Sequence, residues 1–423
     1  MSVISVADVE NANGVMIIGA RDLLTPLAAD RAKELNVRIE RAMAQVTSSA
    51  RPLVRTAPIQ PAAKSPVRIG LAPNHPVKEQ VPIQPGALSG AFYRRGAPVP
   101  TQMRVDDVRS NAAADSKPKA AVIGAGHVGA LTALRIAETS LFSRVMLVDI
   151  VPGLAAGLAL DMWHSSGLRG FTTRIEGSTE LSALQGADYI VMTAGRPRQP
   201  GMTRTDLTGV NAEIIGGVAD GIRTLAPNAV IVVVTNPLEE MTYLMARRTG
   251  FLPNRVIGMA GVLDSARFCS LVALEGIARP QDVKAIALGS HGAEMVIPLS
   301  LATVNDQPLE QLLATDRLTA LVERARDSGA EVVKLLQKGS AYFSPAESAA
   351  AMVAAMVRNN DTMIAACVQS AGAYGVQDTR IGLPVRLGPD GVKEIIKLPL
   401  RPDEQVALAD AARNIAKRIS ELG

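Results

Sequence analysis

The stretch Ala120-Ala-Val-Ile-Gly-Ala-Gly-His-Val-Gly129 decides the fold of this 423-residue chain. Its first four residues form an apolar run, which is typical of a parallel strand buried on both faces. The run passes directly into Gly124-x-Gly126-x-x-Gly129, and a helical pattern then continues to about Glu138. The first glycine suits a tight turn, the second lets a ligand approach the backbone, and the third allows close packing of the helix on the strand. The stretch therefore predicts a strand–turn–helix unit that binds a dinucleotide pyrophosphate at the N-terminus of the helix.

An acidic residue at the end of the next strand supports this interpretation. Val145-Met-Leu-Val148 is a second apolar strand, and Asp149 follows it, 20 residues after Gly129. An acid at this position hydrogen-bonds the ribose hydroxyls and repels a 2′-phosphate, so we expect NAD rather than NADP. A glycine-rich turn without a nucleotide is the alternative, because such turns also occur for structural reasons.

Strands and helical patterns alternate beyond this unit. Tyr189–Thr193 and Val230–Val234 are apolar strands, with a helix expected over about Asn211–Leu225. This alternation predicts an α/β fold with a Rossmann-type parallel sheet. Near Gly258 the pattern becomes mixed, which predicts a second, α+β substrate domain. Its expected helices are 263–277, 317–337, 346–357 and 402–422, and its expected strands are 283–288, 296–304 and a pair around the turn at 388–391.

The first 118 residues differ from the rest. They hold 15 Lys/Arg and 10 Asp/Glu, and residues 46–118 contain 11 prolines without a sustained period. Val15-Met-Ile-Ile18 predicts a short strand, and Thr25-Pro26 predicts the start of a helix that ends near Asn36. The remainder has the composition of a flexible linker. We therefore expect a small N-terminal module at 1–45, a linker at 46–118, an NAD-binding domain at 119–262 and a catalytic domain at 263–423.

Bulk composition excludes several classes of protein. Two cysteines, Cys269 and Cys367, cannot make a disulfide framework, which favours a reducing cytoplasm. The N-terminus lacks the basic and apolar regions of an export signal, and the chain has no apolar run long enough to span a membrane. The basic residues of the extension lack interleaved aromatic residues, so we expect no nucleic-acid partner.

Charged groups that suit a dicarboxylic 2-hydroxy acid follow the cofactor motif. Arg198 and Arg204 lie in a Gly/Pro-rich segment after a strand, and Asp264, Arg267 and His291 come later. A guanidinium binds a carboxylate bidentately, and a histidine oriented by an acid can take a hydroxyl proton while the hydride leaves. Taken singly, each arginine could belong to a solvated loop or a surface ion pair, and the histidine could be structural.

Residues 120–422 resemble the lactate/malate dehydrogenase superfamily, most closely its lactate-dehydrogenase-like malate dehydrogenases. The resemblance rests on seven motifs. They are GAGHVG at 124–129, LVDI at 147–150, AGRPRQPGMTRTDL at 194–207, VTNPLEEMTY at 234–243, GMAGVLDSARF at 258–268, GSHG at 289–292 and GSAYFSPA at 339–346.

The resemblance implies a role for each matching residue. His291 would be the proton donor and acceptor with Asp264 as its partner, and Arg267 would bind the C1 carboxylate. Arg204 would polarise the reacting carbonyl from a closing loop, and Asn236 would contact both substrate and cofactor. The cofactor contacts implied by the motifs are Gly124, Ala125, Gly126, His127, Val128, Gly129, Asp149, Asn211, Val234, Thr235 and Asn236. No metal is implied, and family members form homodimers or homotetramers.

Arg198 separates the two branches of this family. Lactate enzymes carry Gln at its position and malate enzymes carry Arg, which would neutralise the distal carboxylate of oxaloacetate. Ala341 is consistent, because lactate enzymes usually carry Thr there. The sequence therefore predicts a malate dehydrogenase. A lactate or other 2-hydroxyacid dehydrogenase and an NAD-binding scaffold without activity remain alternatives.

Two features depart from the family pattern. Ala293 stands where the usual His-Gly-Asp has its acid, although Glu294 follows. The 118-residue extension has no counterpart in ordinary members. Its segment Leu24–Asn36 resembles an element of bacterial microcompartment proteins, such as those of ethanolamine utilisation. This resemblance would imply a docking partner inside a microcompartment, and a capping element without a partner is the alternative.

Overall fold

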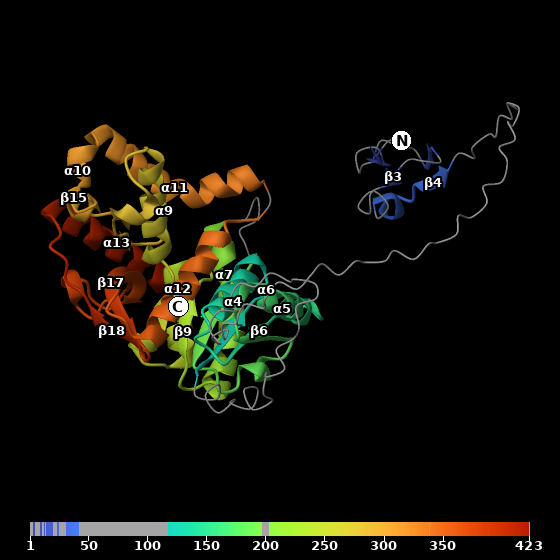
Figure 1. The fold of residues 1–423 in the computed structure, drawn as a ribbon, viewed down its shortest axis with the longest axis horizontal. Coiled ribbons are helices and arrows are strands. Elements are labelled where there is room, and N and C mark those ends of the chain that lie inside the picture. Colours follow the sequence, from blue (N-terminus) through green and yellow to red (C-terminus); the bar gives the residue numbers. More distant parts are fainter. Residues whose placement is uncertain are drawn as a thin grey trace, which may run out of the picture. The chain divides into compact units, whose positions relative to one another are not determined.

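The computed structural model describes residues 117–196, 203–337 and 339–422, preceded by residues 3–4, 9–10, 12, 14–19, 23–24 and 31–41. The chain divides into two compact units, residues 1–82 and 83–423 (Figure 1). The predicted linker at 46–118 falls almost wholly outside the described residues, so the boundaries predicted for the four parts remain predictions.

The described part of the first unit is a small α/β element. A helical turn at residues 31–34 is followed by Asn36, whose φ of 52° is left-handed and ends the helix near the predicted residue. Val9, Ala32 and Val37 are buried together as its core. The predicted start of this helix, at Thr25-Pro26, lies outside the described residues. The strands described in this unit form two parallel pairs. They are β1 (Val3–Ile4) with β3 (Leu23–Leu24), and β2 (Val15–Ile18) with β4 (Arg38–Arg41).

The second unit is organised around one sheet of 11 strands. Six of them are parallel and lie in the order β7-β6-β5-β8-β9-β10. Numbered along the chain, this is the 3-2-1-4-5-6 order of a Rossmann sheet, so the predicted fold class is confirmed. The parallel strands are β5 (Lys119–Ile123), β6 (Arg144–Val148), β7 (Arg174–Ser178), β8 (Tyr189–Met192), β9 (Val230–Val233) and β10 (Val256–Gly258).

Helices cover both faces of these strands. Ala120 and Val122 of β5 pack into the core on one face, while Ala121 and Ile123 pack into the core on the other. This alternation explains why the strands are apolar throughout rather than at every second residue. The first face is covered by α4 (His127–Glu138), α5 (Leu154–His164) and α12 (Phe343–Arg358), and the second by α7 (Arg204–Leu225) and α8 (Leu238–Thr249). The C-terminal helix α13 (Pro402–Ser420) packs beside α8.

The catalytic half continues the same sheet with antiparallel strands. Gly258 at the end of β10 pairs with Cys367, which joins the two halves directly. The expected strands at 283–288 and 296–304 are wrong as continuous elements. Val283–Lys284 pairs in a separate three-stranded sheet whereas Leu288–Gly289 pairs in the main sheet, and Pro298 has no N–H for a ladder bond, so only short strands form. The added strands are β12 (Leu288–Gly289), β13 (Met295–Val296), β16 (Met363–Gln369), β17 (Arg380–Gly388) and β18 (Gly391–Ile395).

A smaller layer packs at the end of the catalytic half. Figure 1 shows α9, α10 and α11 gathered there. Phe268, Val272 and Leu321 are buried in its separate core. No helix within the described ranges is long and apolar enough to cross a membrane. The elements of this layer are α9 (Gly261–Leu274), α10 (Leu309–Leu312), α11 (Thr315–Leu336), β11 (Val283–Lys284), β14 (Thr303–Val304) and β15 (Gln307–Pro308).

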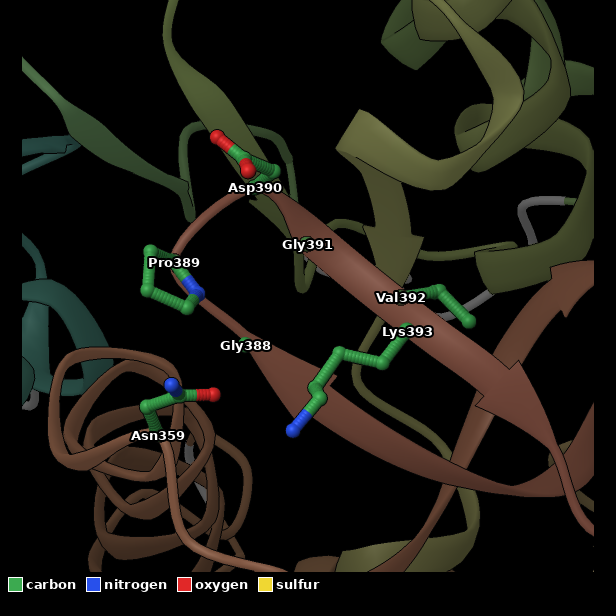
Figure 2. Close-up of a pocket in the computed structure, with 7 residues that line it drawn as sticks. All are labelled: Asn359, Gly388, Pro389, Asp390, Gly391, Val392 and Lys393. Carbon is green, nitrogen blue, oxygen red and sulfur yellow. The ribbon is translucent and has the colours of Figure 1, made fainter.

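A surface cavity lies at the tip of the β17–β18 hairpin (Figure 2). The opposite part of β17 carries Gly382, which pairs with Gly289 beside the predicted catalytic histidine. Six residues of strand separate Gly382 from Gly388, a span of about 20 Å. The cavity is therefore remote from the predicted active site. Its volume is about 440 Å³, and its lining is Asn359, Gly388, Pro389, Asp390, Gly391, Val392 and Lys393.

Candidate active site

The glycine-rich turn between β5 and α4 has the geometry that its sequence predicts. Gly124 has a φ of 99°, and a Cβ there would lie 2.7 Å from the nitrogen of Ala194. A Cβ on Gly129 would lie 1.8 Å from the carbonyl oxygen of Gly124, so only glycine lets α4 pack this close. A Cβ on Gly126 would meet nothing within 4 Å, which leaves open space at the N-terminus of the helix. The first and third glycines thus serve the fold, and the second leaves room for a ligand.

Asp149 lies against this turn at the end of β6. Its Oδ2 accepts a hydrogen bond from the N–H of Ala125 at 2.6 Å, and its Oδ1 accepts one from Val151 at 3.0 Å. Each carboxylate oxygen has a second lone pair for a further donor, such as a ribose hydroxyl. His127, the first residue of α4, is exposed, and its ring lies 5.0 Å from that of Tyr342. Val128 follows it and is partly buried.

The loops after β8 and β9 are hydrogen-bonded to each other beside this turn, both directly and through Asn211 of α7. Asn211 of α7 donates to the carbonyl of Asn236 at 2.7 Å and accepts from the N–H of Arg196 at 2.8 Å. Thr235 donates to the carbonyl of Ala194 at 2.7 Å, and Val234 is buried just before it. The predicted contacts Asn211, Val234, Thr235 and Asn236 therefore meet at the carboxyl edge of the parallel strands. This is where ligands bind in open α/β sheets.

His291, Asp264 and Arg267 form the chemical centre of the site. His291 follows β12, and its Nδ1 lies 2.8 Å from Oδ2 of Asp264 in the first turn of α9. A carboxylate only accepts, so Nδ1 carries a proton, and Nε2 keeps its lone pair when the imidazole is neutral. One turn farther along α9, Arg267 donates from Nη1 to Oδ1 of Asp264 at 3.3 Å. The side chain of His291 is 17% exposed against 2% for Asp264, so the imidazole is reachable while its partner is shielded.

The surroundings of His291 favour its protonated form. Burial lowers its pKa, but the charge of Asp264 and the hydrogen bond to it outweigh burial. The charge of Glu239 adds to this effect, whereas Arg267 opposes it, and the net result is a pKa above the ordinary value of histidine. A histidine of this kind can hold a proton near neutral pH and release it to a developing alkoxide.

The side chains of Arg198 and Arg204, the two arginines predicted to bind substrate near the start of α7, are not among the described ones. Arg198 lies in residues 197–202, outside the described residues. Arg204 is the first residue of α7, and its side chain lies outside the described part. The helix begins here, not near the expected Asn211, because Thr203 and Asp206 form a capping box with bonds of 3.1 Å and 2.9 Å. The Thr203-x-x-Asp206 spacing was a usable signal for this start.

The sequence did not predict two residues, Glu239 and Arg418, that contact the loop of His291. Glu239, in the first turn of α8, accepts a hydrogen bond from the backbone N–H of His291 at 2.6 Å. Arg418, near the end of α13, donates to Ser290 and Glu294 on either side of the histidine. The acidic pair Glu239–Glu240, which follows Asn236-Pro237-Leu238, was a local signal for the first contact. Nothing near Arg418 in the sequence indicates the second.

Comparison with known proteins agrees with this geometry. Residues 118–258 match the family model of the lactate/malate dehydrogenase NAD binding domain, and residues 261–422 match that of the lactate/malate dehydrogenase alpha/beta C-terminal domain. The malate dehydrogenase of Chloroherpeton thalassium is 44% identical over 70% of this chain and 96% of its own length. That of Trichormus variabilis is 45% identical over 71% of this chain and 93% of its own length.

Solved structures show the same relationship. The malate dehydrogenase of Salinibacter ruber matches with a TM-score of 0.69 and 38% identity, over 72% of this chain and 97% of that one. The lactate dehydrogenase of Cryptosporidium parvum, complexed with lactic acid and nicotinamide adenine dinucleotide, matches with a TM-score of 0.70 and 33% identity, over 72% and 98%. The chain carries the fold, the cofactor turn and the histidine–aspartate pair together, and it belongs to the lactate/malate dehydrogenase family.

Proposed function

We propose that the chain is an NAD-dependent malate dehydrogenase that interconverts malate and oxaloacetate. The observation that carries this proposal is the His291–Asp264–Arg267 group, which combines a proton carrier with a carboxylate-binding cation. Curated relatives that share 39–45% of their residues with the chain are named malate dehydrogenase, which supports the same activity.

The cofactor would be held by the strand-end loops. The N-terminus of α4 offers unpaired N–H groups and a positive dipole end to the diphosphate, at the position where Gly126 leaves space. Asp149 would receive the ribose hydroxyls, and a second phosphate on the ribose would be repelled by its charge. Bound NAD supplies the hydride acceptor. The assigned contacts are Gly124, Ala125, Gly126, His127, Val128, Gly129, Asp149, Asn211, Val234, Thr235 and Asn236.

His291 would move the proton of the reaction. In malate oxidation, Nε2 takes the hydroxyl proton while Asp264 stabilises the imidazolium through Nδ1. In oxaloacetate reduction the imidazolium returns this proton to the alkoxide oxygen. The raised pKa of His291, to which Asp264 contributes, suits the second direction, because the donor is then protonated when substrate arrives.

Arginines would bind and orient the substrate. Arg267 is held by Asp264 one helical turn away, and we assign it to the C1 carboxylate. Arg204 and Asn236 are assigned to the reacting carbonyl. Arg198 is assigned to the distal carboxylate, because a monocarboxylic substrate would leave its charge unpaired in a closed site.

The test is NADH oxidation by the purified protein with oxaloacetate and with pyruvate, side by side. Strong preference for oxaloacetate supports malate dehydrogenase activity. Activity on pyruvate at least equal to that on oxaloacetate favours a lactate or other 2-hydroxyacid dehydrogenase. Absence of turnover with both, while NADH still binds, favours the scaffold alternative.

We also propose that the enzyme is a homodimer or homotetramer. Large apolar side chains on and around α5 are exposed, including Leu160 at 56% and Leu168 at 79%, and such a cluster favours a protein partner. Light scattering should give the mass of a dimer or tetramer, and Leu160→Glu should lower it. A wild-type monomer at micromolar concentration would contradict the proposal. The exposed group is Ile150, Val151, Leu154, Leu160, Trp163 and Leu168.

A further inference from the structure

A group of charged side chains from α8 and α13 contacts the loop of His291. Glu239 and Glu240 occupy the first turn of α8 and are 1% and 2% exposed. Arg418 reaches Glu240 from the last turn of α13, and its side chain is 18% exposed. Two adjacent buried acids and a partly buried arginine are costly to place next to a core, so their presence calls for a specific reason.

The contacts of this group converge on one short segment of backbone. Glu239 accepts the N–H of His291 at 2.6 Å. Arg418 donates from Nη2 to Oγ of Ser290 at 3.3 Å and from Nη1 to Oε2 of Glu294 at 2.8 Å, so its guanidinium spans the histidine. Its Nε donates to Oε1 of Glu240 at 3.1 Å, which anchors the same guanidinium on α8. The loop is thus held at the histidine and on both sides of it.

Asp264 alone does not hold the backbone of this loop in place. Its bond to Nδ1 orients the imidazole ring but leaves the backbone of the loop free to shift. Gly289 and Gly292 flank the histidine with φ values of 82° and 132°, conformations that only glycine adopts readily. A loop with a glycine on each side of this segment needs external bonds to hold its central residue in place.

The charges of the group also act on the imidazole. Among the side chains that the structure describes, the charged groups that face the loop are Asp264 and Arg267 from α9, Glu239 and Glu240 from α8, Glu294 from the loop and Arg418 from α13. Burial raises the pKa of the Glu239 carboxyl, which the bond from the His291 N–H only partly offsets. Burial would lower the pKa of Arg418, but its bond to Glu294 and the charge of Glu240 outweigh this effect, so its guanidinium stays charged.

We propose that Glu239 and Arg418 are positioning residues for the proposed dehydrogenase reaction, fixing the backbone and the electrostatic environment of His291 through the loop Ser290–Glu294. Neither touches the substrate. Glu239 holds the histidine directly, and Arg418 ties both flanks of the loop to α8 and to the end of the chain. This inference rests on the proposed function for its kinetic consequences and on the structure alone for its effect on the titration of His291.

The first experiment replaces the charge of Glu239 without changing its shape. In Glu239→Gln, the amide oxygen can still accept the His291 N–H, but the negative charge that favours the imidazolium is gone. We expect the titration midpoint of His291, followed by NMR of histidine-labelled protein, to move to lower pH. The falling limb of the pH profile for oxaloacetate kcat/KM should move with it. Glu404→Gln is the matched control, because Glu404 is also buried and accepts the N–H of Ser300.

The second experiment tests whether the contacts of Arg418 with the loop affect the rate of the reaction. We expect Arg418→Met to lower kcat roughly 10- to 100-fold, as displacement of a reacting group by about 1 Å does, while NADH affinity stays near wild type. Arg418→Lys keeps one charge–charge contact and should recover part of the loss. Arg413→Met, which removes an exposed arginine of the same helix paired with Asp410, should leave kcat unchanged.

The outcomes separate this inference from the proposed function. An unchanged His291 midpoint in Glu239→Gln, or equal kcat in Arg418→Met and Arg413→Met, overturns the inference. If the wild-type protein turns over neither oxaloacetate nor pyruvate, the proposed function fails. The histidine titration in Glu239→Gln still decides the inference in that case, because it needs no substrate. Four histidines are present, so the His291 signal can be assigned from a His291→Gln variant.

Discussion

Replacing Asp264 by Asn tests the central step of the proposed mechanism. The carboxylate contacts Nδ1 of His291 at 2.8 Å and is 2% exposed, so its charge acts across a short and largely dry gap. Two unit charges about 4 Å apart interact by about 4 kcal/mol at an effective dielectric constant near 20. That energy would be lost from the imidazolium, and a loss of this size corresponds to roughly 1,000-fold in rate. We therefore expect kcat/KM for oxaloacetate to fall by roughly this factor in Asp264→Asn.

Two readouts distinguish this effect from damage to the fold. NADH fluorescence should report nearly unchanged cofactor affinity, because Asp264 makes no contact with the glycine-rich turn. The falling limb of the reduction profile should move to lower pH, since the largest attraction that raises the pKa of His291 has been removed. Asp220→Asn is the matched control, because Asp220 also pairs with an arginine, Arg248, but is 48% exposed. A variant that keeps kcat/KM within about threefold of wild type would refute the assignment of Asp264.

The same site supports four further predictions. Arg198→Gln should lower the ratio of oxaloacetate to pyruvate activity, measured as kcat/KM for each, and an unchanged ratio would remove Arg198 from the specificity argument. Gly129→Ala should lower the melting temperature through overpacking worth about 1–3 kcal/mol, because its Cβ would lie 1.8 Å from the carbonyl oxygen of Gly124. Gly126→Ala meets no atom within 4 Å and should keep the melting temperature but weaken NADH binding, so equal NADH affinity in Gly126→Ala and wild type would contradict the cofactor assignment. Oxaloacetate reduction by the wild type should be fast below the raised pKa of His291 and decline as pH rises through it, because only the imidazolium donates a proton; a rate that does not fall would identify another donor.

The parallel half of the sheet could be predicted because its signals are local. An apolar run buried on both faces, a glycine-rich turn and an amphipathic helix are each complete within about 20 residues of sequence. β7 was missed because it is the edge strand and has only one fully buried residue, Ile175. The antiparallel half was harder for a different reason. The pairing of Gly258 with Cys367 joins segments far apart in sequence, and no local pattern states that both halves share one sheet.

The residues of the candidate site also divide into those that the sequence predicts and those that only the packing of distant segments brings into place. His291 and Asp264 were predicted as a pair from the family motifs, and the short contact between them agrees with the pairing. The Asn211–Asn236 bond joins two residues that were predicted separately as cofactor contacts. In contrast, the contact of Arg418 with the loop of His291 could not be predicted from the sequence. It lies on an amphipathic helix whose other basic residues, Arg413 and Lys417, are exposed, and only the packing of that helix against α8 turns Arg418 inward.

Ala293 shows why the charge interactions of this loop cannot be inferred from a single sequence position. Compared with the family pattern, it removes a carboxylate two residues after His291, the proposed catalytic histidine, and the sequence alone leaves the consequence open. In the structure, the next residue supplies a carboxylate, and Glu294 binds Arg418 at 2.8 Å. The same arginine holds Ser290 and Glu240, so the acid at position 294 belongs to a network with four members rather than to a pair. If this network replaces the missing acid, Ala293→Asp should add little to kcat in the wild type but restore part of it in Glu294→Gln. A gain of equal size in both backgrounds would mean that the two positions act independently.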